Sequence, residues 1–324
     1  MLTRHRRELS VAIAIAALAA VLVVAAPGYF SRENLIDLFL ANMPVLIVAL
    51  GMTLVIVAGE IDISVGSVFA VCGVVAGTLV KWGVPLPLAG LAACLPGALL
   101  GAINGGLVAY VGIPSIVVTL AMMVTVRDGL RWITQGAWVQ ELPASFQWLG
   151  LAQATYPMVA CGAAVALLIA FGWGMRHLAA GRAMYATGSN QGAARLTGLD
   201  TARVKFSVFV ATGILTGVAA LLNSVRFNQI PSNAGLGLEM KVIASVIVGG
   251  TAITGGRGTV GGTLLGVILL GAVGPALTFL GASAYWERAL QGAIILAAVA
   301  ADGVRILTHR RGVRPPSDPD LTPI

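Results

Sequence analysis

Residues 38–59 read LFLANMPVLIVALGMTLVIVAG and contain no Asp, Glu, Lys or Arg. An α-helix rises about 1.5 Å per residue, so about 20 apolar residues cross the roughly 30 Å hydrocarbon layer of a bilayer. A polar chain would rarely produce such a run by chance. The stretch therefore predicts a helix that spans a membrane.

Similar charge-free stretches extend in both directions from this one. They are Val11 to Ser31, Ile63 to Val80, Trp82 to Val126, Leu142 to Met175, Phe206 to Val225, Val242 to Gly256, Gly258 to Trp286 and Ala289 to Ala301. The stretch from Trp82 is too long for one crossing, and it divides at residues 111–114 because proline disfavours helix in the residue before it. The sequence thus predicts an all-α polytopic membrane protein with about ten transmembrane helices.

The composition excludes other classes of protein. The chain has 324 residues, of which 58% are hydrophobic and 10% charged, and it carries a net charge of +7. Soluble domains contain about 25% charged residues, and disordered chains lack this apolar content. The basic residues form short clusters between apolar runs, which argues against a nucleic-acid partner. Membrane lipid is the expected environment.

The basic residues also orient the chain. Most of the 20 Lys and Arg residues fall before the first span, between residues 176 and 205, beside Arg257, or after residue 304. Ten crossings place these segments and both termini on one side, and the positive-inside rule makes that side cytoplasmic. The first apolar run is longer than the core of a signal peptide, which predicts an uncleaved span.

This topology predicts one transmembrane domain over residues 1–312, with its long cytoplasmic connection at 176–205. Residues 313–324 are expected to form a disordered cytoplasmic tail. Glycines recur at spacings of four, for example at Gly97, Gly101 and Gly105, and at Gly213 and Gly217. Small residues allow close helix approach in lipid, so these glycines predict helix contacts. Cys72, Cys94 and Cys161 are expected to pack in the bundle, and no metal site is predicted.

Residues 59–66, GEIDISVG, interrupt an otherwise apolar region with two carboxylates and a serine. A carboxylate at mid-bilayer is costly and normally faces protein, water or a partner. Two roles stay open for Glu60, Asp62 and Ser64: a structural role, in which Ser64 caps the following helix, or a place in the path or gate for a solute. Asn104 raises the same choice between an interhelical hydrogen bond and contact with a solute.

Residues 181–200, GRAMYATGSNQGAARLTGLD, form the centre of the cytoplasmic connection. Ser189 or Asn190 can cap a short helix, and Gly198 can end it in a left-handed conformation. Ala193, Leu196 and Leu199 give the helix a small apolar stripe. A helix of about two turns is marginally stable in water, so it is expected to pack against its own bundle or another protein.

The chain resembles the bacterial ABC-type sugar permeases that include the ribose, xylose, arabinose, rhamnose and autoinducer permeases. Four motifs carry the likeness in the same order. They are Gly59 to Gly66, the run from Pro114 to Leu120 that includes Thr119, the segment from Gly181 to Gly198, and the glycines Gly249, Gly250, Gly255, Gly256 and Gly258. Glu60 and Ser189 stand where the family has glycine, and Lys241 follows Glu239 where an acidic residue is more usual.

The resemblance implies a membrane-spanning permease subunit of an ATP-driven importer in the inner membrane. It implies partner ABC ATP-binding subunits, a periplasmic sugar-binding protein, and a second permease copy or a sister permease. The residues implied to couple to the ATPase are Gly188, Ser189, Asn190, Ala193, Ala194, Arg195, Leu196 and Gly198. The candidates for the translocation path or gate are Glu60, Asp62, Ser64, Asn104, Thr119 and Glu239.

The expected cargo is a monosaccharide or a small polyol, and residues 114–119 and 143–148 look closest to rhamnose-type permeases. The sequence contains no GxxxxGK[ST] phosphate loop, so we expect no enzyme and no cofactor in this chain, with ATP and Mg²⁺ bound by a partner. A secondary transporter of a small polar solute is the alternative. Such a protein is expected to place ionisable residues near mid-bilayer, where only Glu60 and Asp62 are candidates.

Overall fold

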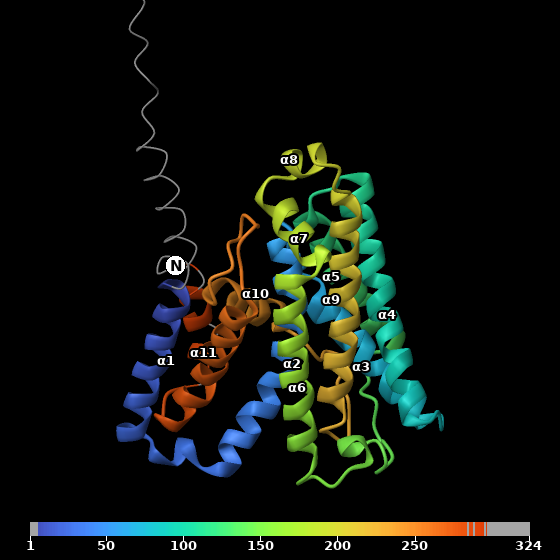
Figure 1. Ribbon diagram of the computed structural model, residues 1–324. Coiled ribbons are helices and arrows are strands. Elements are labelled where there is room, and N and C mark those ends of the chain that lie inside the picture. The colour runs from blue at the N-terminus through green and yellow to red at the C-terminus, as the bar shows by residue number, and fades with distance from the viewer. Residues whose placement is uncertain (1–5, 284, 288, 295, 297–324) are drawn as a thin grey trace, which may run out of the picture.

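The computed structural model describes residues 6–283, 285–287, 289–294 and 296, and these residues form a bundle of helices (Figure 1). Its α-helices are α1 (Arg6–Ala25), α2 (Arg32–Val57), α3 (Val65–Lys81), α4 (Leu86–Gly106), α5 (Ser115–Thr134), α6 (Tyr156–His177), α7 (Ala179–Ser189), α8 (Gln191–Leu196), α9 (Thr201–Ser224), α10 (Leu238–Val248) and α11 (Val260–Phe279). Three short elements join them: η1 (Pro27–Phe30), the π-helical η2 (Leu107–Val111) and η3 (Gln147–Gly150). The described residues contain no β-strand, only an isolated bridge between Val139 and Ile230.

Six helices in the described part of the chain are long and apolar enough to cross a membrane: α1, α2, α4 with η2, α6, α9 and α11. The apolar helix α3 is shorter, with 17 residues. These helices confirm the predicted all-α, multi-pass class. Helix α5 has 20 residues but carries Arg127, Asp128 and Arg131 in its second half.

One predicted span was wrong. The stretch from Val242 to Gly256 is not one span, because α10 has only 11 residues and the backbone from Gly249 to Thr259 is not helical. Glycines at 249, 250, 255 and 256 favour turns over helix, and three of them have positive φ. Within the charge-free stretch from Leu142, the helix starts at Tyr156, after the connection that follows α5. Residue 295, residues 297–301 of the predicted span at 289–301, and all of the predicted tail lie outside the described residues.

Helix α2 forms the centre of the bundle. Its residues from Met43 to Val57 are all buried, because α9, α10, α11 and α6 surround it. A helix that is apolar on every side is stable only when it is enclosed in this way or faces lipid. The position of α2 matters for function because its last residue, Val57, reaches the end of the bundle where α7 and α8 lie.

The predicted glycine contacts are confirmed between α4 and α9. A Cβ atom on Gly97 would overlap the carbonyl oxygen of Gly213, and one on Gly217 would lie 2.7 Å from the Cα atom of Cys94. The two backbones therefore touch along their length, as small residues permit between helices in lipid. Because α9 follows directly after α8 in the chain, this rigid contact links the end of the bundle to its centre.

Figure 1 shows where the connections lie. Helices α7 and α8 sit together at one end of the bundle (top of the view), with α8 outermost. The loop between α5 and α6 lies at the opposite end. We call the first of these the α8 end of the bundle.

Candidate functional site

Helix α8 is short and is capped at both ends as the sequence predicts. The Asn190 side chain accepts a hydrogen bond from the backbone N–H of Ala193 at 3.0 Å, which confirms Asn190 as the N-cap. Gly198 follows the helix with φ +84°, in the left-handed region. Ser189 is the last residue of α7 and not the cap. The chain therefore fixes the ends of a six-residue helix that is too short to be stable alone.

The apolar stripe of α8 is not covered by this chain. Leu196 is 91% exposed and Ala193 is exposed as well, whereas Ala194 on the other side of the helix is buried. Leu199 is half-buried against the bundle. The helix thus uses one face to pack on its own protein and presents the other, with an exposed leucine, at the outermost point of the α8 end.

Three of the glycine-containing motifs meet directly beneath α7. The N–H of Gly256 donates to the carbonyl oxygen of Val57 at 2.9 Å, and a Cβ on Gly188 would overlap that same oxygen. A Cβ on Gly255 would lie 2.8 Å from the Cα of Gly59 and 2.9 Å from the carbonyl oxygen of Gly188. We call this contact of residues 57–59, 188–189 and 255–256 the glycine junction.

A tyrosine extends the glycine junction along α7. The Tyr185 hydroxyl donates to the carbonyl oxygen of Gly258 at 2.7 Å. Helix α7 is therefore held to the loop between α10 and α11 as well as to the end of α2. Close backbone contact of this kind leaves little room for α7 to move independently of these two segments.

A buried ion pair lies beside the glycine junction. The ammonium group of Lys205 on α9 contacts the carboxylate of Glu60, and the two side chains are only 13% and 11% exposed. Lys205 also donates to the side-chain oxygen of Gln191, the first residue of α8, at 3.0 Å. This relay of Gln191, Lys205 and Glu60 connects α8 to the segment between α2 and α3.

The corner between α8 and α9 is also fixed by side chains. Arg195 donates through Nε to the hydroxyl of Thr201 at 2.9 Å, and the Asp200 carboxylate caps α9 by accepting from the N–H of Arg203 at 3.0 Å. Thr201 is buried at the start of α9. These contacts make α8 and the first turn of α9 one unit.

Asp62, Ser64 and Asn104 form a second polar group, which is buried. The Ser64 hydroxyl donates to Asp62 Oδ1 at 2.6 Å and accepts from Asn104 Nδ2 at 2.9 Å. The proposed capping role of Ser64 was wrong, because its hydroxyl makes no cap bond to α3. Burial raises the pKa of the Asp62 carboxyl, and the hydrogen bonds from Ser64 and Asn104 lower it in part.

Thr119 lies close to this group on α5. Its hydroxyl donates to the carbonyl oxygen of Ser115 at 2.8 Å, and the hydroxyl of Ser115 accepts from the N–H of Ile61 at 3.2 Å. The start of α5 is thereby attached to the segment between α2 and α3. Asp62, Ser64, Asn104 and Thr119 are all buried, so they hold three elements together in this conformation.

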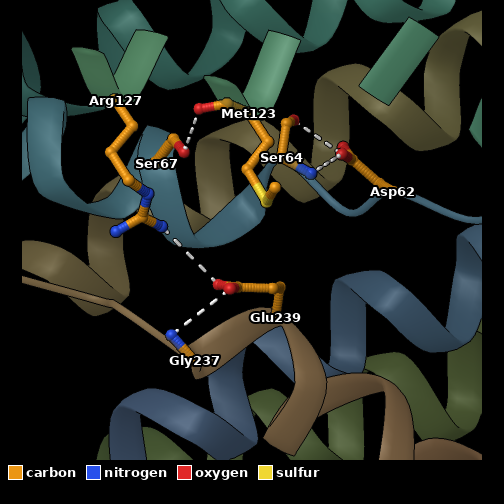
Figure 2. Close-up of polar contacts among 7 residues, drawn as sticks. All are labelled: Asp62, Ser64, Ser67, Met123, Arg127, Gly237 and Glu239. Atoms are coloured by element: carbon orange, nitrogen blue, oxygen red, sulfur yellow. Dashed lines mark hydrogen bonds and ion pairs between the residues drawn. The ribbon is translucent and has the colours of Figure 1, made fainter. Parts of the chain in front are cut away.

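The remaining path candidate, Glu239, lies apart from these residues at the start of α10. Figure 2 shows the guanidinium group of Arg127, from α5, pointing toward its carboxylate, and the two groups are 3.7 Å apart. Glu239 Oε1 accepts from the N–H of Gly237 at 3.3 Å. The Asp62 and Ser64 group lies on the other side of the first turn of α3 (Figure 2).

Sequence reasoning missed three charged or polar partners: Gln191, Lys205 and Arg127. Lys205 and Arg127 each stand at the edge of an apolar run, which is a signal that a charged side chain needs a partner in the bundle. Nothing in the sequence shows which residue pairs with which. Among the described residues, no cluster of His, Cys, Asp and Glu could hold a metal ion.

A bundle of membrane-spanning helices with a short, capped helix at one end defines a multi-pass membrane protein. The family model described as the permease component of the branched-chain amino acid transport system matches residues 34–299. The chain belongs to this family of transport permeases and is a multi-pass protein of the inner membrane. Its resemblance to ABC-type sugar permeases of the ribose and autoinducer branch is thereby confirmed.

Curated relatives extend over almost the whole chain. The autoinducer 2 import system permease protein LsrC of Enterobacter sp. (strain 638) is 35% identical over 314 residues, which cover 95% of this chain and 91% of the relative. The protein of the same name from Photorhabdus luminescens is 32% identical over 93% of this chain and 91% of its own length. That from Escherichia coli (strain K12 / DH10B) is 35% identical over 89% and 86%. No solved structure matches the chain.

These relatives are named as transport permeases and not as enzymes, as the sequence predicts for this chain. They do not support the preference for a rhamnose-type sugar, and they do not favour a secondary transporter.

Proposed function

We propose that this chain is the permease subunit of an ATP-driven, binding-protein-dependent importer of autoinducer 2 or a chemically similar monosaccharide or small polyol. Its relatives over nearly the full length bear the name of an autoinducer 2 import permease, which supports the choice of cargo. The rest of the proposal concerns which partners act on the chain and where they act.

The exposed leucine of α8 is the observation that carries the proposal. Leu196 is 91% exposed on a helix whose other face is attached to the bundle by Ala194, Arg195 and Gln191. An apolar side chain on a short, anchored helix is suited to a groove in a partner protein. We assign that groove to an ABC ATP-binding subunit, which binds ATP and Mg²⁺, and we place Gly188, Ser189, Asn190, Ala193 and Gly198 in the same contact region.

The charge pattern supports an orientation. We place the α8 end and both termini in the cytoplasm, because the segment 176–205 is rich in arginine and cytoplasmic loops carry such an excess. The periplasmic sugar-binding protein then delivers its solute to the opposite end. A second copy of this chain or a sister permease completes the path, and an even number of crossings, about ten, places both termini on the same side.

The contacts suggest how ATP drives transport. Movement of the ATP-binding subunits displaces α8, and the relay of Gln191, Lys205 and Glu60 passes the displacement to the segment between α2 and α3. The glycine junction passes it to α2 and to the loop before α11. The buried group of Asp62, Ser64, Asn104 and Thr119 then acts as the inner gate, opening when the two permeases rock between outward- and inward-facing states.

Replacement of Leu196 tests the contact with the ATPase. In the complete importer reconstituted in proteoliposomes, Leu196→Asp is expected to abolish ATP-driven uptake while the protein still inserts and folds. Leu151→Asp, which alters an exposed leucine at the opposite end, is the matched control. Normal uptake by the Leu196→Asp importer would contradict the proposal, as would solute accumulation by the isolated chain without any ATP-binding subunit.

A further inference from the structure

Helix α10 covers only half of a membrane. Its 11 residues rise about 16 Å, against a hydrocarbon layer of about 30 Å. Its last turn leads into the glycine junction at the α8 end, where Gly256 bonds to Val57. Counting back along the axis, the first residues of α10 lie near the middle of the bilayer.

The backbone that precedes α10 is therefore irregular at membrane depth. Residues 231–237, PSNAGLG, form turns, and Gly235 and Gly237 have φ values of +74° and +84°. Backbone of this kind is found within a bilayer only where it is enclosed by protein or borders a water-filled cavity. In transporters, the ends of interrupted helices are places where solutes and ions bind.

Arg127 and Glu239 lie at this interruption. Their side chains are 13% and 10% exposed, yet the distance of 3.7 Å makes a loose pair. Both guanidinium nitrogens Nη1 and Nη2 of Arg127, and Oε2 of Glu239, are buried without a hydrogen bond. Buried polar groups are normally hydrogen-bonded, and a charged one left unpaired costs several kcal/mol. The pair thus has donors and an acceptor to offer to a further group.

The side chains next to the buried pair are exposed. Leu236 and Met240, on either side of Glu239 in the sequence, are 58% and 55% exposed, and Val124 on α5 is exposed too. On α5, the next charged residues after Arg127 are Asp128 and Arg131, which are exposed and pair with each other at 3.6 Å. Charged side chains within a span face water or protein and not lipid, so this surface between α5 and α10 faces the path or the second permease.

We propose that Arg127 and Glu239 bind hydroxyl groups of the transported solute on the wall of the translocation path between α5 and α10. A guanidinium group donates two parallel hydrogen bonds and a carboxylate accepts them, so together they match two neighbouring hydroxyls of a sugar or polyol. The apolar side chains of Leu236, Met240 and Val124 surround this polar site. This inference rests on the proposed importer function and identifies the residues that contact its cargo.

Gly66 has no side chain, which leaves room for the Glu239 carboxylate. The carboxylate of Glu239 packs on this glycine in the first turn of α3, where a Cβ would overlap Oε2 and lie 3.1 Å from Nη2 of Arg127. It would also lie 2.6 Å from the carbonyl oxygen of Gly235. Gly66→Ala is therefore expected to displace Glu239 and to mimic loss of the site, although it removes no charge.

The first experiment measures whether water and a polyol reach the site. In the importer complex with Cys161→Ser, the Met240→Cys thiol is expected to react with a membrane-impermeant methanethiosulfonate reagent. D-ribose, used as the probe polyol, is expected to slow this reaction, whereas the same concentration of glycine betaine, which has no hydroxyl, is not. Glu239→Gln in the same background should remove the protection. Absence of labelling, or protection that survives Glu239→Gln, would overturn the inference.

The second experiment separates solute binding from a purely structural attachment of α10 to α5. Hydrogen bonds to charged groups contribute 1.5–3 kcal/mol, so Glu239→Gln or Arg127→Gln should lower autoinducer 2 uptake about 10- to 150-fold. ATPase stimulation by the loaded binding protein is expected to persist, because neither residue lies at the α8 end. Lys81→Gln, which breaks the exposed pair with Glu141 at the opposite end, is the control for lost charge.

A charge exchange decides between the two roles. If the pair only joins the helices, Arg127→Glu with Glu239→Arg should restore uptake, and that result would overturn the inference. Failure of the unaltered importer to take up autoinducer 2 or ribose would count against the proposed function, but the thiol-protection experiment would still report on the polyol site.

Discussion

Removing Lys205 should break the link between α8 and the segment between α2 and α3. Lys205 joins the Glu60 carboxylate to the Gln191 side chain, and its own side chain is 13% exposed. Lys205→Met keeps most of the side-chain volume and removes the charge. Glu60 then stays buried with no described partner for its carboxylate, since its ion pair is with Lys205 alone.

The magnitude follows from burial. Breaking a buried ion pair by removing one partner costs about 3–5 kcal/mol, and the residual exposure of both groups reduces this to about 2–4 kcal/mol. Glu60→Gln should cost less, about 1–2 kcal/mol, because the amide can still bond to Lys205 and Lys205 keeps Gln191. Lys205→Met is thus predicted to lower the free energy of unfolding more than Glu60→Gln does.

Two assays read the effect. Equilibrium unfolding of the purified permease in detergent gives the free-energy difference, and reconstituted importer gives the ratio of solute imported to ATP hydrolysed. Lys205→Met is expected to lower this ratio several-fold while ATPase activity falls much less. The reason is that the displacement of α8 no longer reaches the segment between α2 and α3. The exchange Glu60→Lys with Lys205→Glu should recover part of the ratio.

Two outcomes would refute this reasoning. If Lys205→Met proved less destabilising than Glu60→Gln, the buried carboxylate would not depend on the lysine. If both variants kept the unaltered ratio of solute imported to ATP hydrolysed, the relay would not transmit the displacement of α8. The covalent link from α8 to α9 would then be sufficient for coupling.

Three further changes have definite expected outcomes. Gly188→Ala should cost about 1–3 kcal/mol in detergent unfolding, because its Cβ overlaps the Val57 carbonyl oxygen, whereas Gly192→Ala, whose Cβ meets only Asn190 Oδ1 at 3.4 Å, should be tolerated. Asn190→Ala should destabilise α8 by about 0.5–2 kcal/mol and raise hydrogen exchange at residues 191–196, and unchanged exchange would exclude the capping role. Burial raises the Asp62 pKa above its usual 3.8, so the stability of the fold falls as pH rises from that value through the raised pKa. Asp62→Asn should flatten this part of the plot of thermal-unfolding temperature against pH, and an unaltered plot would contradict the assignment.

Local features of this chain could be predicted from its sequence. Asn190 and Gly198 define the ends of α8 through backbone chemistry that depends on single residues. The glycines of α4 and α9 mark a contact because only small residues let two backbones touch. Each of these signals is contained within a few neighbouring positions.

Features that depend on distant residues could not be predicted. Glu60 and Lys205 are far apart in the chain, and only the fold brings them together. The apolar content of residues 242–256 suggested a span, whereas the glycines after Val248 turn the chain back toward α2. Ser64 has the chemistry of a cap, but the nearby Asp62 carboxylate competes for its hydroxyl.

Cross-linking at Leu196 tests the central claim most directly, namely that force enters this permease through α8. A photoreactive amino acid placed at position 196 in the importer complex should attach covalently to the ATP-binding subunit, with a yield that changes between the ATP-bound and nucleotide-free states. Attachment to lipid or to the periplasmic binding protein, or reaction only with reagents on the outer side of the membrane, would contradict the account.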